Sequence, residues 1–497
     1  MYKIKLIESL GLTGSYIALS HCWGQDNSPL ETTRKTLSSY LEEIQFPLLP
    51  KTFQDAVRIT ESLGISYLWI DSLCIIQHDE EDWKVETSKM EDVYSNAFIT
   101  LAATGSSSSH GGCLFSRKHI TDHGISIPHK DSKFHSDRAL VPGGVNIRYK
   151  LGSHTDVMEQ YLLAKFGGAP LLNRAWVLQE RLLSPVFLHF HKEELVWECQ
   201  ESTSCECGFL EWEAVSYDNL QQRGEISIKA DFIRLSKTLG HPEAQQETYN
   251  FWLKAIEYFT SLSITKDSDR LPAVTGIARR LCKSIPGCYL LGIWSSDLAR
   301  GLLWQIAPYQ QSVRVTVPSG CHLPTWSWAS VNIVSTNYYG LSYSEISSPF
   351  QIDSRFNIQR SGLGQNIFVP GQRCSLLLSG AFIFCTLKCE RPAENFIPSH
   401  VLNFQDQEEY MYIDVSCDLN TVGQSCRSRK VCCLLVGGPS ELGKLVWTKS
   451  ERIETRVYWS LVLQQLASGD YERIGVAAHD SKQGWFEKAE VKQITLI

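Results

Sequence analysis

The first hundred residues alternate short apolar segments with helix-length spacers, and this alternation restricts the fold more than any other feature of the chain. The apolar segments are residues 16–20, 67–70 and 98–103, and the intervening stretches with helical apolar spacing are 52–63 and 82–97. Strands joined by helix-length crossovers pair in parallel, with right-handed connections. The sequence therefore predicts an α/β fold in which these three strands are neighbours in a central, mostly parallel sheet.

Beyond this segment, the pattern predicts a further helix and then a change of architecture. A helix at 174–183 precedes a hairpin of strands at 186–190 and 195–199. The rest of the chain has the pattern first of amphipathic helices and then of short strands separated by turns. The chain divides into three predicted regions, namely an α/β core at 1–200, a helical elaboration at 201–320 and a β-rich region at 321–497.

The composition excludes several classes of partner and location. The net charge is −7, the pI is about 6.1 and there is no basic stripe, so neither nucleic acid nor an anionic membrane is an expected partner. No apolar run reaches the length needed to span a bilayer. Among the 16 cysteines, Cys22, Cys74 and Cys432 lie in apolar segments, where a free thiol behaves as a small hydrophobe. The sequence therefore predicts a reducing, cytoplasmic location and no structural disulfides.

Polar residues follow two of the predicted strands at the point where each strand ends. His21, Cys22 and Trp23 come directly after the first strand, and Asp71 comes directly after the second. The carboxyl ends of parallel strands lie at one edge of a sheet, where α/β folds bind ligands. We therefore identify His21 and Asp71 as candidate catalytic residues, and Cys22 and Trp23 as candidate substrate-binding residues. The structural alternative is a strand end closed by a packed Trp23, with Asp71 capping the following turn.

The third predicted helix carries the remaining candidate residues. Trp176 and Glu180 are four residues apart and hence lie on one face of that helix. Glu180 is a candidate catalytic carboxylate, and Trp176, Arg174 and Arg181 are candidate substrate-binding residues. The structural alternative is that Glu180 and Arg181 belong to a buried ion pair.

Neither a cofactor nor a metal ion is expected from the motifs. The sequence contains no dinucleotide-binding glycine motif, no P-loop and no hydrolase nucleophile elbow. His189, His191, Cys199, Cys205 and Cys207 carry metal-binding atoms, but their spacing lacks the ligand pairs usual in zinc sites. The expected ligand is therefore a small-molecule substrate or a protein partner.

Three sequence blocks resemble the signature blocks of the fungal heterokaryon-incompatibility (HET) domain family. They are Tyr16-Ile-Ala-Leu-Ser-His-Cys-Trp-Gly24, Tyr67-Leu-Trp-Ile-Asp-Ser-Leu-Cys-Ile-Ile-Gln77 and Arg174-Ala-Trp-Val-Leu-Gln-Glu-Arg-Leu-Leu-Ser184. Shorter similarities, including Pro324-Thr-Trp-Ser-Trp-Ala329, extend the resemblance to about residue 330. The chain resembles a stand-alone member of the family, without an evident sensor domain.

The resemblance implies that the chain is an incompatibility or cell-death effector. Such an effector acts through protein partners or, as an enzyme, by hydrolysing NAD. The HET fold is distantly similar to Toll/interleukin-receptor (TIR) domains. The spacing of Trp176 and Glu180 is similar to that around the catalytic glutamate of TIR domains that hydrolyse NAD. A glutamate in such a position can stabilise an oxocarbenium-like ribosyl transition state.

An enzyme of fungal secondary metabolism is the alternative function for a HET scaffold. In that case an aromatic-rich pocket would shape a polyketide or terpenoid for cyclisation or for a pericyclic, Diels–Alder-type reaction. Such a reaction depends mainly on preorganised shape and on one or two hydrogen-bond donors. The chain contains 14 Trp residues, which is compatible either with such a pocket or with a deep core.

Overall fold

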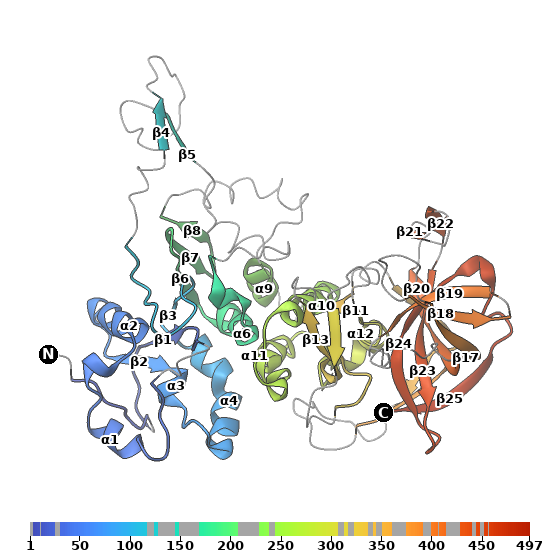
Figure 1. Cartoon of the computed structure of the whole chain (residues 1–497), viewed down its shortest axis with the longest axis horizontal. Helices are drawn as coiled ribbons and strands as arrows, with labels where there is room; N and C mark the ends of the chain where they lie inside the picture. The colour runs from blue at the N-terminus through green and yellow to red at the C-terminus, as the bar shows by residue number, and fades with distance from the viewer. Residues whose placement is uncertain are drawn as a thin grey trace. The chain divides into compact units, whose positions relative to one another are not determined.

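The computed structural model describes residues 3–9, 11–24, 30–116, 124–127, 145–148, 168–206, 228–237, 244–306, 313–316, 323–335, 341–343, 350–359, 374–390, 399–405, 407–413, 428–439, 444–447, 452–455 and 457–497. The chain forms two compact units, Met1–Ile233 and Arg234–Ile497 (Figure 1). Each unit contains a sheet of its own, and each is described by itself.

The first unit is built on a six-stranded sheet with the strand order β2-β1-β3-β6-β7-β8. Its strands are β1 (Tyr16–Ser20), β2 (Tyr67–Ile70), β3 (Ile99–Ala102), β6 (Val186–Phe190), β7 (Leu195–Cys199) and β8 (Thr203–Cys205). β1 pairs in parallel with β2 and β3, and β3 pairs in parallel with β6. The predicted mostly parallel sheet is confirmed, with β1 between the other two predicted strands. The predicted hairpin is confirmed as well, because β6 and β7 are antiparallel.

Helices cover both faces of this sheet. They are α1 (Leu37–Glu42), α2 (Lys51–Ser62), α3 (Asp71–Cys74), α4 (Glu80–Ser95), α6 (Ala175–Leu183) and α9 (Ile228–Lys237), and a separate hairpin consists of β4 (Gly124–Ile127) and β5 (Val145–Arg148). One face of the sheet packs Leu19 and Leu101 against Phe53 of α2. On the opposite face, Thr100 Oγ1 lies 2.7 Å from Ser184 Oγ at the end of α6. Neighbouring strand residues point to opposite faces, so Thr100 and Leu101 contact different helices.

Both predicted helices between the first three strands begin slightly earlier than expected. α2 begins at Lys51, one residue early. α4 begins at Glu80, two residues early, because the Asp79 carboxylate caps it. The Asp79 carboxylate accepts hydrogen bonds from the backbone amides of Glu81 and Asp82, at 3.1 and 3.2 Å. These bonds satisfy amides that the first turn of a helix leaves without partners.

The second unit begins with helices and continues as a large, mostly antiparallel sheet. The helices are α10 (Gln245–Ser261), α11 (Pro272–Leu281) and α12 (Leu298–Gly301). The large sheet consists of β15 (Phe350–Ile352), β16 (Asn357–Gln359), β17 (Leu376–Glu390), β18 (Ser399–Phe404), β19 (Gln407–Ile413), β20 (Arg429–Pro439), β23 (Val457–Gln465), β24 (Tyr471–Asp480) and β25 (Glu490–Leu496). Shorter strands pair two by two: β9 (Tyr289–Leu290) with β10 (Ile293–Trp294), β11 (Gln305–Ile306) with β14 (Leu341–Ser342), β12 (Val313–Thr316) with β13 (Asn332–Ser335), and β21 (Lys444–Trp447) with β22 (Arg452–Thr455). The helices and the β-rich pattern agree with the sequence prediction for this part of the chain.

Six strands of the large sheet close on themselves. β17 pairs with β20, β20 with β23, β23 with β24, β24 with β19, β19 with β18, and β18 again with β17. All six pairings are antiparallel. We call this arrangement the strand ring. A closed ring leaves no free edge among these six strands, which removes the exposed backbone groups that an open sheet presents.

Tryptophan side chains fill the part of the second unit that precedes the strand ring. Trp294, Trp304 and Trp328 are almost completely buried. The indole nitrogen of Trp328 donates a hydrogen bond to Gly292 O at 2.9 Å. Gly292 has a φ of +101°, and a Cβ atom there would lie 2.3 Å from Trp328 Nε1. Only glycine fits this turn, because it tolerates both the left-handed backbone and the close indole.

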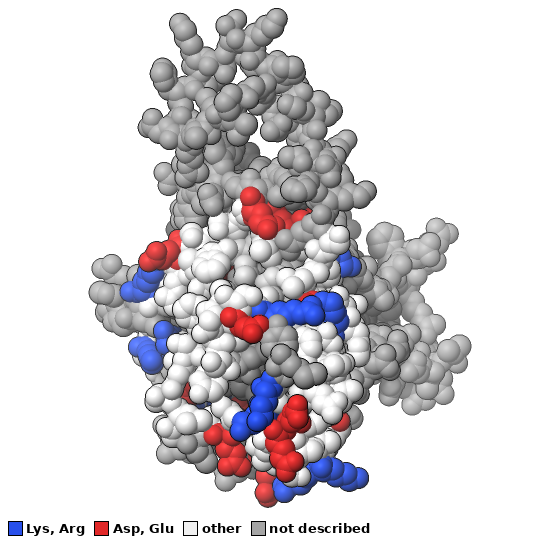
Figure 2. All heavy atoms as spheres, turned by 90° about the vertical axis from the view of Figure 1, so that its left-hand side faces the viewer, with Lys and Arg blue, Asp and Glu red and all other residues white. Residues whose placement is uncertain are grey.

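Figure 2 shows one face of the molecule, on which acidic and basic side chains of the described residues are interspersed. Among the described helices, none combines the length and the apolar character needed to cross a membrane.

Candidate functional site

The end of β1 brings two signature blocks into contact. Trp23 follows β1, and its indole nitrogen donates a hydrogen bond of 2.9 Å to Asp71 Oδ2. Asp71 is the first residue of α3, directly after β2. Parallel pairing of β1 with β2 places both strand ends at the same edge of the sheet, which explains this contact.

His21 is buried beside the Asp71 carboxylate. Its Nδ1 atom lies 3.6 Å from Asp71 Oδ1, and its ring packs edge-on against Phe53 with the centroids 4.9 Å apart. Neither ring nitrogen has a hydrogen-bond partner among the described residues. Burial lowers the pKa of His21 to about 4, against the opposing charge of Asp71. The imidazole is therefore neutral at pH 7 and has both nitrogens free for a ligand or a water molecule.

Asp71 both caps a turn and lies beside His21 and Trp23. Its Oδ1 atom accepts a hydrogen bond from Ser72 N at 2.7 Å, so the carboxylate does cap the turn, as the structural alternative predicted. Its side chain is still 23% exposed, and it contacts both His21 and Trp23. Asp71 is therefore partly exposed to solvent, as is Trp23, whereas His21 is buried.

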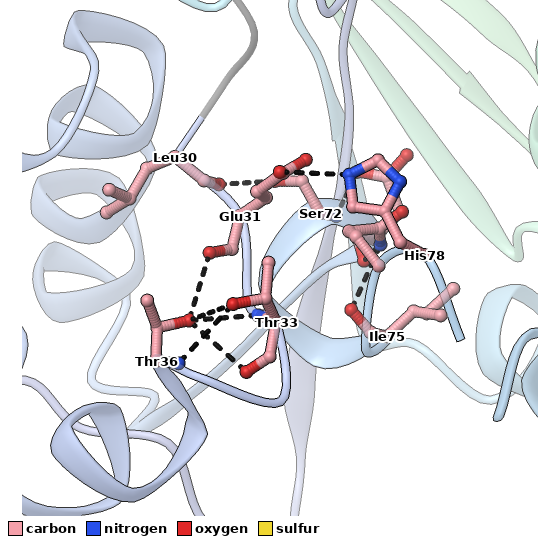
Figure 3. Close-up of polar contacts among 9 residues, drawn as sticks. Leu30, Glu31, Thr33, Thr36, Ser72, Ile75 and His78 are labelled. Carbon is pink, nitrogen blue, oxygen red and sulfur yellow. Dashed lines mark hydrogen bonds and ion pairs between the residues drawn. The ribbon is translucent and has the colours of Figure 1, made fainter.

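Polar contacts fix α3, and with it Asp71, to the segment that follows the first block (Figure 3). Ser72 Oγ donates a hydrogen bond to Leu30 O at 3.0 Å, and His78 Nε2 lies 3.2 Å from Glu31 Oε1. The hydroxyl groups of Thr33 and Thr36 lie 3.2 Å apart at the turn before α1. The Ser72–Leu30 and His78–Glu31 contacts join residues more than 40 positions apart and hold α3 and the residues after it against this segment.

The third signature block contributes Arg174 and Glu180. The Arg174 guanidinium donates a hydrogen bond to the carbonyl oxygen of His21, which joins the start of α6 to the end of β1. Glu180 lies about one and two-thirds turns further along the chain, within α6, with 6% of its surface exposed. The hydroxyl groups of Ser20 and Tyr94 approach its carboxyl group. One polar region is therefore surrounded by the side chains of Ser20, His21, Asp71, Tyr94, Arg174 and Glu180.

The carboxyl group of Glu180 has an unusually high pKa. Burial raises its pKa to about 7, although interactions with Ser20, Arg174 and Tyr94 lower it and the charge of Asp71 raises it further. A group that titrates near neutrality can both accept and donate a proton at cellular pH. Carboxyl groups with such shifts concentrate at functional sites.

Cys22 lies in the same region but is not a nucleophile at neutral pH. Burial raises the pKa of its thiol to about 11, and the charge of Arg174 only partly offsets this effect. The thiol is therefore protonated and packs with Ala102 and Val177 in an apolar cluster. Trp176 is half-buried on α6, one turn before Glu180.

Arg181 does not join this region, although it follows Glu180 directly. Consecutive residues of a helix point about 100° apart, so Arg181 reaches β7 instead. Its Nε and Nη2 atoms each lie 2.6 Å from the Glu198 carboxylate, and both side chains are buried. The structural alternative stated above placed both Glu180 and Arg181 in a buried ion pair. In the structure, Arg181 belongs to such a pair and Glu180 does not pair with it.

The Arg181 pair is part of a second, fully buried polar cluster. Glu198 Oε2 lies 2.9 Å from His189 Nε2, and His189 Nδ1 lies 2.9 Å from Thr104 Oγ1. Lys229 Nζ donates hydrogen bonds to the carbonyl oxygens of Arg181 and Ser184, at 2.8 and 2.9 Å. Burial alone would raise the pKa of Glu198, but Arg181 and His189 hold it well below its usual range.

His189 and Lys229 in this cluster have lowered basicity. Burial lowers the pKa of His189 to about 4 and that of Lys229 to about 7. His189 is therefore neutral at pH 7, and its two ring nitrogens have hydrogen-bond partners in Glu198 and Thr104. Among the described residues, no group of three or more His, Cys, Asp or Glu side chains is arranged to hold a metal ion.

Sequence reasoning missed the residues that hold the loop beside the site. The buried Asp55 carboxylate accepts hydrogen bonds from Cys113 N and Leu114 N, at 3.1 and 3.3 Å. Ser109 Oγ in the same loop donates to Trp23 O at 3.4 Å. The available signal in the sequence was the polar residue Asp55 on the apolar face of the predicted helix at 52–63. Its partners in the loop are more than 50 residues away in the chain. Tyr94 was also missed as a site residue, because it lies within an ordinary amphipathic helix.

The acidity of Glu180 leads to an expected pH dependence of stability. The carboxyl group is protonated below pH 4.5 in both folded and unfolded chains. Between pH 4.5 and about 7 the folded chain keeps the proton that the unfolded chain loses, so the free energy of unfolding falls as pH rises through this window. The total loss is roughly 3 kcal/mol at about 1.4 kcal/mol per pKa unit. Glu180→Gln removes it, so the variant should gain this much stability relative to the wild type by pH 7.5.

Denaturant unfolding of both proteins at several pH values measures this difference. Subtracting the two curves isolates Glu180 from other titrating groups. A difference that stays constant between pH 4.5 and 7.5 would show that the carboxyl group of Glu180 has an ordinary pKa in the folded chain.

Comparison with known proteins gives one match for the first unit. Residues 16–180 match the model of the family described as Heterokaryon incompatibility protein (HET). The matched range includes β1, β2, β3 and the site residues from Ser20 to Glu180. No curated protein and no solved structure gives a significant match.

Proposed function

Because residues 16–180 constitute a heterokaryon-incompatibility (HET) domain, we propose that the chain is an incompatibility-type effector that hydrolyses the bond between nicotinamide and ribose in NAD. The observation that carries this proposal is the buried Glu180 carboxyl group beside Arg174, Asp71 and His21 at the carboxyl edge of the sheet. Such edges are where α/β folds bind nucleotides. A carboxylate held there matches the charge that develops when a glycosidic bond breaks.

Breaking this bond places a positive charge on the ribose. Nicotinamide leaves as a neutral molecule, so the leaving group needs no proton. The Glu180 carboxylate would stabilise the oxocarbenium-like ribosyl group, and the positive charge of bound NAD would itself favour the ionised form of Glu180. Arg174 would pair with a phosphate oxygen of the substrate, as guanidinium groups do.

Attack by water completes the reaction. The oxygen of water forms a bond to the ribose carbon that nicotinamide leaves, and the water gives up one proton. Neutral His21, with both ring nitrogens free of protein partners among the described residues, is suited to accept this proton. The neighbouring Asp71 carboxylate would stabilise the resulting imidazolium. The products are nicotinamide, ADP-ribose and one proton.

Incubation of the purified full chain with NAD tests this proposal. We expect nicotinamide and ADP-ribose to appear in equal amounts, at a rate proportional to the protein concentration, when the products are separated by liquid chromatography. A cytoplasmic location, which the cysteine usage predicts, would give the protein access to the cellular NAD pool. Intact NAD after prolonged incubation would contradict the proposal.

The alternative function, an enzyme of secondary metabolism, would require a different kind of site. A cyclase needs an open apolar pocket lined by aromatic side chains. In the second unit, however, Trp252 packs edge-on against Tyr289 and Trp294, with centroids 5.6 and 5.8 Å apart. These aromatic side chains contact one another, and such packing favours a core over a pocket. The NAD assay separates the alternatives, because a cyclase would leave NAD unchanged.

A further inference from the structure

The interior of the strand ring contains two thiols that touch. Cys385 on β17 and Cys433 on β20 belong to the buried cluster inside the ring, with exposed fractions of 5% and 0%. Their sulfur atoms are 3.4 Å apart. Both cysteines are in the free thiol form.

The strand register explains why the two side chains meet. β17 and β20 are antiparallel, with Ile383 opposite Cys433 and Cys385 opposite Val431. Cys385 and Cys433 are therefore diagonal neighbours on the same face of the pair. Diagonal neighbours of this kind can approach closely across an antiparallel pair.

The thiols continue into a chain of polar groups in an otherwise apolar interior. Ser460 on β23 interacts with the Cys433 thiol, and its Oγ atom lies 2.7 Å from Nε2 of His479 on β24. His479 packs against the rings of Trp485 and Phe486, with centroids 4.9 and 5.1 Å away. Among the described residues the Nδ1 atom of His479 has no hydrogen-bond partner, and the two thiols lie mainly against each other and the apolar lining.

We propose that Cys385 and Cys433 are an oxidisable pair that forms an intramolecular disulfide when the protein meets a peroxide. In the net step two S–H bonds break and one S–S bond forms, while hydrogen peroxide takes up the two hydrogens and becomes two molecules of water. The bond would link β17 to β20 between residues 48 positions apart in the chain. Such a link restricts the unfolded chain and stabilises the folded ring. This inference is independent of NAD hydrolysis.

The environment of Cys433 sets the rate of this step. The hydrogen bond with Cys385 and burial raise the pKa of Cys433 well above its usual range. The thiolate is the reactive form, so oxidation at pH 7 should be slow and should accelerate at pH 9. In a reducing compartment the pair stays in the dithiol form, as the sequence predicts for the cysteines generally.

Peroxide treatment of the full chain, followed by thiol blocking and peptide mass spectrometry, tests the proposal. We expect a cross-linked peptide pair that contains Cys385 and Cys433, lighter by two hydrogen atoms than the two peptides together. The oxidised protein should have two fewer titratable thiols than the 16 of the reduced chain, and a higher midpoint of thermal unfolding. Dithiothreitol should reverse both changes.

Two variants provide the controls. Cys385→Ala keeps a small apolar side chain and should abolish both the cross-link and the rise in melting temperature. Cys432→Ser changes the adjacent buried residue, whose side chain points to the other face of β20, and should leave the cross-link intact. The proposal fails if Cys385 and Cys433 both remain free to react with the blocking reagent after peroxide treatment and unfolding. It also fails if Cys433 links to Cys432 or another cysteine instead.

Discussion

Glu180→Gln is expected to lower kcat for NAD hydrolysis about 10²–10⁴-fold, the range for loss of a group that stabilises or transfers charge in the transition state. The substitution keeps the size and most of the shape of the side chain, so the packing of α6 should not change. It removes the negative charge that the developing ribosyl cation requires. The KM for NAD should change far less, because Glu180 is proposed to act on the transition state more than on the bound substrate.

The stability of this variant separates a catalytic role from a structural one. Burial raises the pKa of Glu180, so the ionised form is the costly one and Gln should not destabilise the chain at pH 7.5. A structural ion-pair residue would show the opposite, a loss of a few kcal/mol from the partner charge left behind, with about 3–5 kcal/mol typical of a buried pair. Glu61→Gln, on the exposed side of α2, is the matched control and should alter neither activity nor stability. Full NAD hydrolysis by Glu180→Gln would remove Glu180 from the proposed mechanism.

Glu198→Gln is expected to lower the free energy of unfolding of the first unit by about 3–5 kcal/mol, as removal of one partner from a buried ion pair does. The variant leaves the Arg181 guanidinium buried without its two charged contacts at 2.6 Å. It also weakens the acceptor for His189 and leaves the nearby Lys229 charge less compensated. Denaturant unfolding measures the loss, and hydrogen exchange of peptides from β6 and β7 assigns it to the first unit.

A double-mutant cycle shows whether the cost arises from the stranded charge. Adding Arg181→Met to Glu198→Gln should recover a large part of the lost stability, because no unpaired guanidinium remains. Glu201→Gln, on the exposed turn between β7 and β8, is the control, with an expected change within about 0.5 kcal/mol. Additive effects of Arg181→Met and Glu198→Gln would contradict a direct ion pair in solution.

The sequence by itself determined the pairing of the first three strands of the first sheet and the hairpin that follows them. The alternation of apolar strands and helix-length spacers predicted parallel pairing of β1, β2 and β3, and the hairpin of β6 and β7 had the expected bounds. These features are local patterns combined with the handedness of crossovers, and both can be followed along the chain without knowing any contact. The same reasoning placed His21 and Asp71 at one edge of the sheet, where the structure has them 3.6 Å apart.

Only the tertiary structure decided which charged side chains share a site. Glu180 and Arg181 are adjacent in sequence, yet one faces Ser20 and Tyr94 while the other pairs with Glu198. Sequence spacing gives the face of a helix, but the neighbours of that face come from strands and helices up to 160 residues away in the chain.

The contact between the two thiols in the strand ring is likewise decided by the tertiary structure. Cys385 and Cys433 meet because of a strand register that depends on the closing of the whole ring. Burial also sets the acidity of Glu180 and His21, and burial is a property of the packed chain. Protonation and pairing of charged groups depend on desolvation and on distances of a few ångströms, which only the folded chain fixes.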